Sequence, residues 1–331
     1  MGANKTIMVT GANGFIGSCL VAYFISKGIR DLVVVDHFDR RRMKHDYLNN
    51  YNHVHRIDVD ELFSNGTPWE KEVQFVVHLG AISSTLEKNV ESLRRYNLEF
   101  SKKIWEFCTN SHIPLVYASS AATYGTNIQY FSDEHADIDG LIPVNGYAKS
   151  KHEFDRWALS QNETPPQWIG FKFFNVYGPN EYHKGSGASM VFHAYNQIMA
   201  GDEVKLFKSY RREYDHGNQK RDFIYVMDIV DIIFGLVRNG IENNGLFNLG
   251  TGKSRSFNEM VRILAGLLER DIKITYIDIP HVLERQYQYF TEADMTKFHG
   301  FVDKNRTFTS LEIGISHYIQ HLKSNTVSGI F

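Results

Sequence analysis

A glycine-rich loop near the N-terminus constrains the fold of this chain more than any other feature of its sequence. Gly11, Gly14 and Gly17 recur in the spacing G-x-x-G-x-x-G. The loop follows the apolar run TIMVT at 6–10, which predicts a strand, and leads into an apolar segment at 18–26 that predicts a helix. Glycines let backbone N–H groups approach a pyrophosphate closely, and a helix N-terminus stabilises its charge. We therefore expect this loop to bind a dinucleotide.

Further apolar runs predict a parallel sheet that is covered on both faces. DLVVVD at 31–36 and QFVVH at 74–78 are apolar almost throughout, as strands in the middle of such a sheet are. Other strands are expected at 54–59, 114–118, 167–173 and 246–249, and helices at 91–108, 148–160, 190–200 and 258–269. This alternation is typical of an α/β fold with a doubly wound parallel sheet, the Rossmann arrangement.

The chain length indicates how this fold is divided. The 331 residues can hold one large domain or two of ordinary size. We expect a dinucleotide-binding domain over 1–175, to which the chain returns near 223–252, and a smaller substrate-binding cap over 176–331.

Charge and hydropathy disfavour several classes of partner. With 36 Lys+Arg against 38 Asp+Glu, the formal net charge is −2, so no overall positive field favours nucleic acid. No apolar run approaches the roughly 18 residues of a membrane span, and the N-terminus lacks the pattern of a signal peptide. Cys19 and Cys108 are far apart, as expected of a reduced cytoplasmic protein. Because no ligand set accompanies His53 and His55, we expect no metal site.

The end of the second predicted strand bears on the choice of dinucleotide. Asp36 stands there, where a carboxylate accepts hydrogen bonds from an adenosine ribose and favours NAD. Arg40, Arg41 and Arg42 follow, and they can instead neutralise the 2′-phosphate of NADP. The residues alone leave both dinucleotides open.

Ser120, Tyr147 and Lys151 carry the expected chemistry. Tyr147 and Lys151 are four residues apart, which places them on one face of a helix with Cβ atoms about 5–6 Å apart. A nearby ammonium and a positive nicotinamide can lower the pKa of the phenol from about 10 to near 7. Tyr147 then accepts a proton from a substrate alcohol while hydride leaves. Ser120 lies just past the end of a predicted strand, where ligands of open α/β sheets bind.

This order of motifs resembles the extended short-chain dehydrogenase/reductase family of nucleotide-sugar enzymes. HLGAISS at 78–84, FNVYGPNEYHKGSGAS at 174–189 and FNLGTG at 247–252 are similar to its ADP-heptose 6-epimerases, and most relatives lack a lysine where Lys184 stands. The resemblance implies a homo-oligomer that epimerises ADP-D-glycero-D-manno-heptose at C6 for lipopolysaccharide core biosynthesis. It implies transient oxidation to a 6-ketone and re-reduction by tightly bound NADP(H), with NAD as the alternative.

The resemblance also implies roles for individual residues. Phe15 and Ile16 would lie on the pyrophosphate, and Asp36 and His37 at the adenosine ribose. The nicotinamide side would be lined by Leu79, Gly80, Ala81, Ile82, Ser83, Asn97, Lys151 and Val176. The sugar nucleotide would be held by Asn175, Ser186, His193, Phe207, Lys208, Ser209, Tyr210, Arg221 and Tyr287.

Lys184 bears on the stereochemistry. Rotation about the C5–C6 bond of a 6-ketone presents its other face to the hydride and moves the oxygen away from the first acid–base group. A second acid–base group is then needed, and Lys184 can provide it; the alternative is that Lys184 only binds the diphosphate.

Three rival functions have weaker support. A 4,6-dehydratase needs carboxylates after Ser120, where this chain has Ala121 and Ala122. A 4-epimerase does not require Lys184, and a catalytically silent dinucleotide-sensing module typically loses the tyrosine or lysine that this chain keeps.

Overall fold

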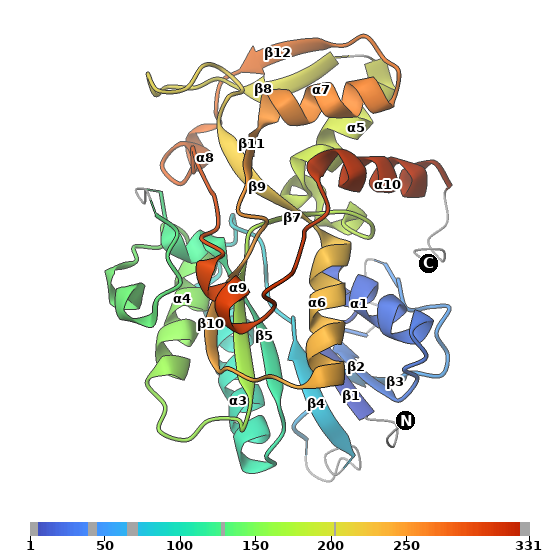
Figure 1. Cartoon of the computed structure of the whole chain (residues 1–331), viewed down its shortest axis with the longest axis vertical. Helices are drawn as coiled ribbons and strands as arrows, with labels where there is room; N and C mark the ends of the chain where they lie inside the picture. Colours follow the sequence, from blue (N-terminus) through green and yellow to red (C-terminus); the bar gives the residue numbers. More distant parts are fainter. Residues whose placement is uncertain (1–5, 39–44, 65–71, 127–129, 202, 325–331) are drawn as a thin grey trace.

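The computed structural model of the protein describes residues 6–38, 45–64, 72–126, 130–201 and 203–324. Its larger part is a seven-stranded sheet with the order β10-β6-β5-β4-β1-β2-β3, in the lower half of Figure 1. The strands are β1 (Thr6–Thr10), β2 (Leu32–Asp36), β3 (His55–Asp58), β4 (Val73–His78), β5 (Leu115–Ser120), β6 (Trp168–Phe173) and β10 (Gly245–Leu249). Every neighbouring pair is parallel, which confirms the predicted doubly wound sheet and all seven of its predicted strands.

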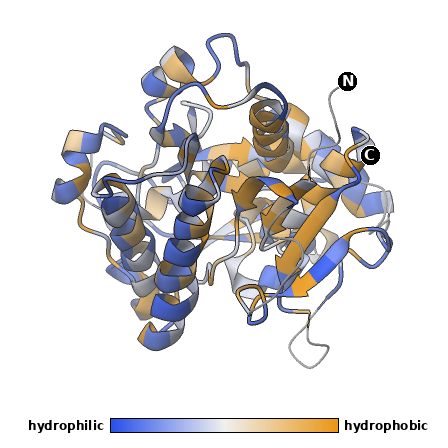
Figure 2. Cartoon of the chain, turned by 90° about the horizontal axis from the view of Figure 1, so that it is seen from below, coloured by the Kyte–Doolittle hydropathy of each residue, from blue (hydrophilic) through white to orange (hydrophobic). Residues whose placement is uncertain are grey.

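Both faces of the large sheet are buried, as its continuous apolar strands predict. Ile7 and Val9 belong to one hydrophobic cluster and Met8 to a second, because successive side chains point to opposite faces. The first cluster includes residues of α1 (Phe15–Ser26) and α6 (Val226–Asn239), and the second those of α3 (Phe100–Asn110) and α4 (Gly146–Leu159). In Figure 2 the strands are mainly in the hydrophobic colour, while the helices are mixed.

The helix expected over 91–108 is interrupted in its middle. It begins as α2 (Val90–Leu93), continues as the π-helical turn η2 (Arg94–Glu99) and ends as α3. Asn97, inside this turn, is fully buried, so the widened turn directs a polar side chain into the protein.

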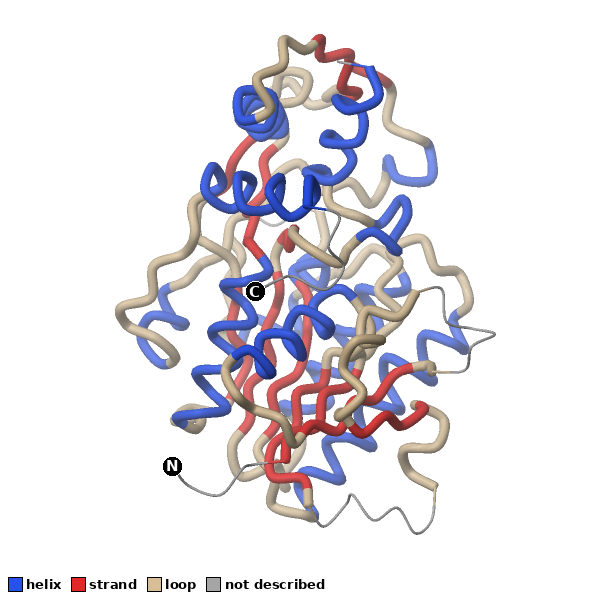
Figure 3. Tube along the Cα trace, turned by 90° about the vertical axis from the view of Figure 1, so that its right-hand side faces the viewer, coloured by secondary structure: helices blue, strands red, loops and turns tan. Residues whose placement is uncertain are grey.

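A smaller cap lies above the large sheet, as Figures 1 and 3 show. Its strands are β7 (Asn175–Tyr177), β9 (Lys220–Tyr225) and β11 (Ser254–Ser256) in one sheet, and β8 (Glu203–Phe207) and β12 (Lys273–Ile277) in another. Its helices are α5 (Met190–Gly201), α7 (Phe257–Leu267), α8 (His281–Glu284) and α10 (Leu311–Ser324). The short helix α9 (Thr296–Phe301) contacts β10 of the large sheet.

Three short 3-10 helices connect the larger elements of the described chain, namely η3 (Ala121–Tyr124), η4 (His135–Gly140) and η5 (Tyr182–Gly187).

After the cap strand β9, the chain passes along α6 and joins the large sheet as β10. The return near 223–252 stays a prediction. The division into two domains near residue 175 stays a prediction. Across the described ranges, no helix is long and apolar enough to cross a membrane.

Candidate active site

A cavity of about 720 Å³ opens at the carboxyl ends of the parallel strands, on the side of the cap. This is where open α/β sheets bind their ligands. Its wall brings together eighteen of the predicted site residues, namely Gly11, Gly14, Phe15, Ile16, Gly17, Asp36, His37, Leu79, Gly80, Ala81, Ile82, Ser83, Ser120, Tyr147, Lys151, Asn175, Val176 and Lys184. The glycine loop, the serine and the Tyr-x-x-x-Lys pair thus face one space.

The glycine loop fits a pyrophosphate. Gly14 precedes α1 and provides no side-chain cap, so the first N–H groups of the helix remain available to an anion. Gly11 has a φ of 67°, which favours glycine. A Cβ added at Gly17 would collide with the carbonyl oxygen of Gly11. The loop therefore keeps its backbone tight against the cavity only with glycine at these positions.

Asp36 holds the glycine loop in place at the end of β2. Its carboxylate accepts the backbone N–H of Asn13 at 2.8 Å and that of His37 at 2.7 Å. Asn13 in turn accepts from the backbone N–H of Tyr47 at 2.9 Å. Asp36 thus joins the expected pyrophosphate and ribose sites. Arg40, Arg41 and Arg42 lie outside the described residues.

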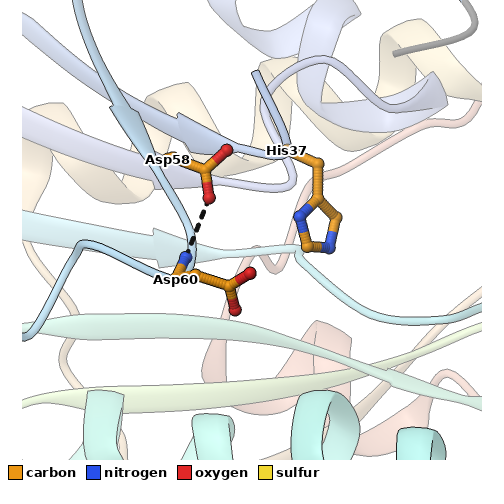
Figure 4. A group of neighbouring side chains, drawn as sticks. All are labelled: His37, Asp58 and Asp60. Atoms are coloured by element: carbon orange, nitrogen blue, oxygen red, sulfur yellow. Dashed lines mark hydrogen bonds between the residues drawn. The ribbon is translucent and has the colours of Figure 1, made fainter. Parts of the chain in front are cut away.

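His37, Asp58 and Asp60 form a polar group beside this end of the cavity (Figure 4). Their nitrogen and oxygen atoms lie within 4.8 Å of one another, as metal ligands do. The Asp58 carboxylate, however, accepts the backbone N–H groups of Phe38 and Asp60, each at 3.0 Å. Asp60 also accepts from Arg95 at 2.8 Å. Hydrogen-bond donors of the protein already contact both carboxylates, and we assign no metal to this group.

Lys151 and Tyr147 project from α4, whose first turn Asn145 caps by accepting from the N–H of Ala148 at 2.9 Å. The Nζ of Lys151 donates to the carbonyl oxygen of Ala118 at 2.8 Å. Burial lowers the pKa of Lys151 to about 8.

The expected fall in the pKa of Tyr147 depends on a charged lysine and a bound nicotinamide acting together, and it stays a prediction. In the protein alone, burial raises this pKa, while the nearby Ser120 hydroxyl acts in the opposite direction.

A buried network supports Ser120 and α4 from behind. Asp155, on α4, accepts from the hydroxyl of Ser119 at 2.6 Å and from the Nζ of Lys172 at 2.7 Å. Lys172, on β6, also donates to the hydroxyl of Thr123 at 2.9 Å. Residues on both sides of Ser120 are thus tied to the helix that carries Tyr147.

Asn97 lies behind the cavity wall and its side chain is fully bonded to the protein. Its Oδ1 accepts from the N–H of Ile82 at 2.8 Å, and its Nδ2 donates to the carbonyl of Ile82 and the hydroxyl of Ser150. It therefore joins α4 to the 79–83 loop, which is the loop expected on the nicotinamide side.

Lys184 reaches the cavity from η5. Its Nζ lies 5.4 Å from the ring centroid of Phe15, and burial lowers its pKa while the charge of Glu181 acts in the opposite direction. Tyr147 and Lys184 therefore present two acid–base groups to one cavity from different elements.

Nine predicted site residues are not on the cavity wall. They are Asn97, expected on the nicotinamide side, and eight expected substrate contacts, namely Ser186, His193, Phe207, Lys208, Ser209, Tyr210, Arg221 and Tyr287. Lys208 and Tyr210 instead share Asp278, at 3.0 Å and 2.7 Å. Phe207 and Arg221 contact the ring of Tyr287, so these three form one group in the cap. The roles of these nine residues, like the roles of the eighteen on the wall, stay predictions.

Comparison with known proteins identifies the family to which this chain belongs. A sequence model described as "NAD dependent epimerase/dehydratase family" matches residues 7–250. The chain belongs to this family. This member of the epimerase/dehydratase family is also similar, over 95% of its length, to ADP-L-glycero-D-manno-heptose-6-epimerases. It is 39% identical to that of Fusobacterium nucleatum, covering 95% of this chain and 97% of the relative. It is 41% identical to that of Nitratidesulfovibrio vulgaris, covering 95% and 96%.

Solved structures agree with this placement. The crystal structure of Helicobacter pylori ADP-L-glycero-D-manno-heptose-6-epimerase matches with a TM-score of 0.78 and 29% identity, covering 97% of each chain. A UDP-N-acetylglucosamine 4-epimerase from Methanobrevibacter ruminantium matches with a TM-score of 0.79 at 22% identity, covering 98% of this chain and 99% of that chain. The second match shows that the fold is shared.

Several residues of the site were missed by sequence reasoning. Gln288 lines the cavity and donates to the carbonyl of Gly125 at 2.7 Å. The rings of His45 and His183 stack on its wall with centroids 3.9 Å apart. His183 has a sequence signal, since it precedes Lys184, whereas nothing in the sequence pairs it with His45.

Proposed function

We propose that this protein interconverts ADP-D-glycero-D-manno-heptose and ADP-L-glycero-D-manno-heptose by epimerisation at C6. The observation that carries the proposal is the presence of Tyr147 and Lys184 on one cavity wall. Inverting an exocyclic carbon through a ketone requires acid–base groups at two positions of the oxygen, and Tyr147 and Lys184 reach this cavity from two different elements. Relatives at 39% and 41% identity that bear this name support the proposal.

In this proposal, different residues exchange protons with the C6 oxygen before and after rotation about the C5–C6 bond. Tyr147 takes the proton of the C6 hydroxyl, and Ser120 beside it helps to orient that oxygen. A nicotinamide dinucleotide, when bound, supplies the acceptor and donor of hydride. After rotation about C5–C6, Lys184 donates a proton to the oxygen in its new position, and its lowered pKa favours this transfer. The two groups exchange roles in the reverse direction.

Arg221 supports a diphosphate-containing substrate. Its side chain is buried, and its guanidinium lies over the rings of Phe257 and Tyr287, 5.3 Å and 5.2 Å from their centroids. Among the described residues, no carboxylate forms an ion pair with it. A buried guanidinium without an acidic partner is costly unless an anion binds it, and a diphosphate matches its planar donors. Phe257 also lines the cavity, which connects Arg221 to the catalytic wall.

We further propose NADP as the dinucleotide, with NAD as the alternative. The sequence Arg40-Arg41-Arg42 after β2 supports NADP, because guanidinium groups can neutralise a 2′-phosphate, whereas Asp36 supports the alternative. Because epimerisation has no net redox change, the dinucleotide stays bound throughout. Protein purified without added nucleotide should release NADP on denaturation; release of NAD alone would contradict the NADP assignment.

The homo-oligomer implied by the resemblance also stays a prediction. Light scattering on the purified protein tests it, and a monomeric mass at working concentration would contradict it.

Turnover of defined sugar nucleotides tests the proposed function. Purified protein with ADP-D-glycero-D-manno-heptose should yield the L-glycero epimer, and UDP-glucose should yield no UDP-galactose. Conversion of UDP-glucose alone would favour a 4-epimerase, and a 4-keto-6-deoxy product would favour a dehydratase. Binding of dinucleotide without any turnover would favour a silent module.

A further inference from the structure

One buried carboxylate connects the two ends of the segment 178–189, which carries Lys184. Glu181 is fully buried. Its carboxylate accepts from the backbone N–H of Gly178 at 3.2 Å, from the hydroxyl of Ser189 at 2.7 Å and from the backbone N–H of Ser189. Glu181 thus ties the two ends of the 178–189 segment together, with Lys184 between them.

The same base is attached to the helix that follows the glycine loop. Asn180 donates to the hydroxyl of Ser18 on α1 at 3.0 Å, and the thiol of Cys19 donates to the carbonyl of Pro179 at 3.3 Å. Lys184 itself reaches back toward α1, over the ring of Phe15. The first part of the segment is thus attached to α1, and the Glu181 carboxylate joins its far end, at Ser189, to this attached part.

The partners of Glu181 require a carboxylate. All three are donors, and Ser189 also accepts from the N–H of Phe192 at 3.2 Å, which fixes the direction of its hydroxyl. A glutamine amide would turn an NH₂ group toward one of these donors, which leaves a buried polar group unpaired. The backbone contributes as well, since the N–H of Lys184 donates to the carbonyl of Glu181 at 3.0 Å.

We propose that Glu181 is a positioning residue for Lys184: by joining Gly178 to Ser189 it holds the lysine over the dinucleotide loop, at the position from which it serves C6. This inference rests on the proposed function, because it assumes that Lys184 is an acid–base group. Glu181 contacts no substrate and acts through the loop.

Substitution of Glu181 tests the inference against a matched buried carboxylate. Asp228 likewise accepts from the backbone N–H and the hydroxyl of one residue, Thr309, at 2.9 Å and 3.0 Å, and does not line the cavity. It also pairs with Arg306 at 3.2 Å, so its substitution disturbs at least as many buried contacts. Glu181→Gln should lower kcat about 10- to 100-fold, the scale for misplacing a catalytic group, with KM and dinucleotide content within about twofold. Asp228→Asn should keep kcat within about twofold even if it unfolds at a lower temperature.

A double substitution separates positioning from general damage. If Glu181 acts through Lys184, then Glu181→Gln added to Lys184→Met should lower kcat by no more than about twofold beyond Lys184→Met alone. The inference would be overturned if kcat of the double variant fell by the product of the two single losses, or if folded Glu181→Gln had a normal kcat.

If Glu181→Gln does not fold, Ser189→Ala takes its place. Its kcat should fall severalfold on the wild-type background and should not fall further on the Lys184→Met background. Normal turnover by Lys184→Met would instead overturn the acid–base role of Lys184, and with it this inference.

Discussion

The Nζ of Lys172 lies 2.7 Å from a carboxylate oxygen of Asp155, and both side chains are almost completely buried. Lys172 belongs to β6, whereas Asp155 belongs to α4, four residues after Lys151. The pair therefore fixes the helix of Tyr147 and Lys151 to the sheet, directly behind the strand end where Ser120 stands.

Lys172→Met should lower the free energy of unfolding by about 3–5 kcal/mol, because it leaves the Asp155 carboxylate buried without its counter-charge. Lys102→Met is a suitable control, since Lys102 is partly exposed and lies 3.7 Å from Glu99. A surface pair of that kind contributes at most about 1 kcal/mol. Urea unfolding measures the free energy of unfolding of both variants. If both substitutions lowered it by the same small amount, the supporting role of the buried pair would be contradicted.

Gly14→Val should abolish dinucleotide binding while the fold remains. A Cβ at Gly14 would meet only the carbonyl oxygen of Gly11, at 3.1 Å, but the branched side chain would occupy the space in front of the helix N-terminus. Gly266→Ala on α7 is the control, because nothing lies within 4 Å of its added Cβ. Dinucleotide released on denaturation gives the readout, with circular dichroism as the check of folding. Normal dinucleotide content in folded Gly14→Val would refute the position assigned to this loop.

His78→Gln should make the protein less sensitive to acid. Burial, and secondarily the charge of Lys151, lowers the pKa of His78 to about 3. The unfolded chain takes up a proton near pH 6.5 and the folded protein does not, so stability falls as the pH drops below about 6.5. Between there and about pH 4 the wild type should lose about 3 kcal/mol that His78→Gln retains. His53→Gln is the control, because His53 is exposed. The urea concentration at the midpoint of unfolding is measured for each protein across this pH range. If the midpoints of His78→Gln and wild type fell in parallel with pH, His78 would not be the source of the acid sensitivity.

Tyr147→Phe and Lys184→Met should each lower kcat about a hundredfold or more, which is the usual scale for loss of an acid–base group. Their KM values should change far less, because neither side chain is the main anchor of the diphosphate. Lys205→Met, an exposed lysine on β8, should behave as wild type. If Lys184→Met raised KM and left kcat unchanged, Lys184 would be a diphosphate ligand and not an acid–base group.

Much of the large sheet was predictable because its signals are local. Continuous apolar runs such as those of β2 and β4 predict buried parallel strands, and the strand–glycine–helix order around Gly14 predicts the dinucleotide loop. Ser120, Tyr147 and Lys151 follow from their positions relative to these elements. The structure places all of them on one cavity.

What could not be predicted depends on contacts between distant segments. The pairing of Asp155 with Lys172, and of His45 with His183, is set by how α4, β6 and the loops pack. The sequence around Asn97 shows no hydrophobic periodicity that distinguishes a π-helical turn from an ordinary helix. The burial that raises the pKa of Tyr147 in the protein alone is likewise a property of the folded protein.

Epimerisation in deuterated water tests the central claim most directly. Purified protein is incubated with ADP-D-glycero-D-manno-heptose in D₂O, and the product is examined by proton NMR and mass spectrometry. If Tyr147 and Lys184 move protons only at the oxygen while hydride leaves and returns within the cavity, the L-glycero product should carry ordinary hydrogen at C6. Deuterium at C6 of the product, or the absence of any L-glycero product, would contradict the account.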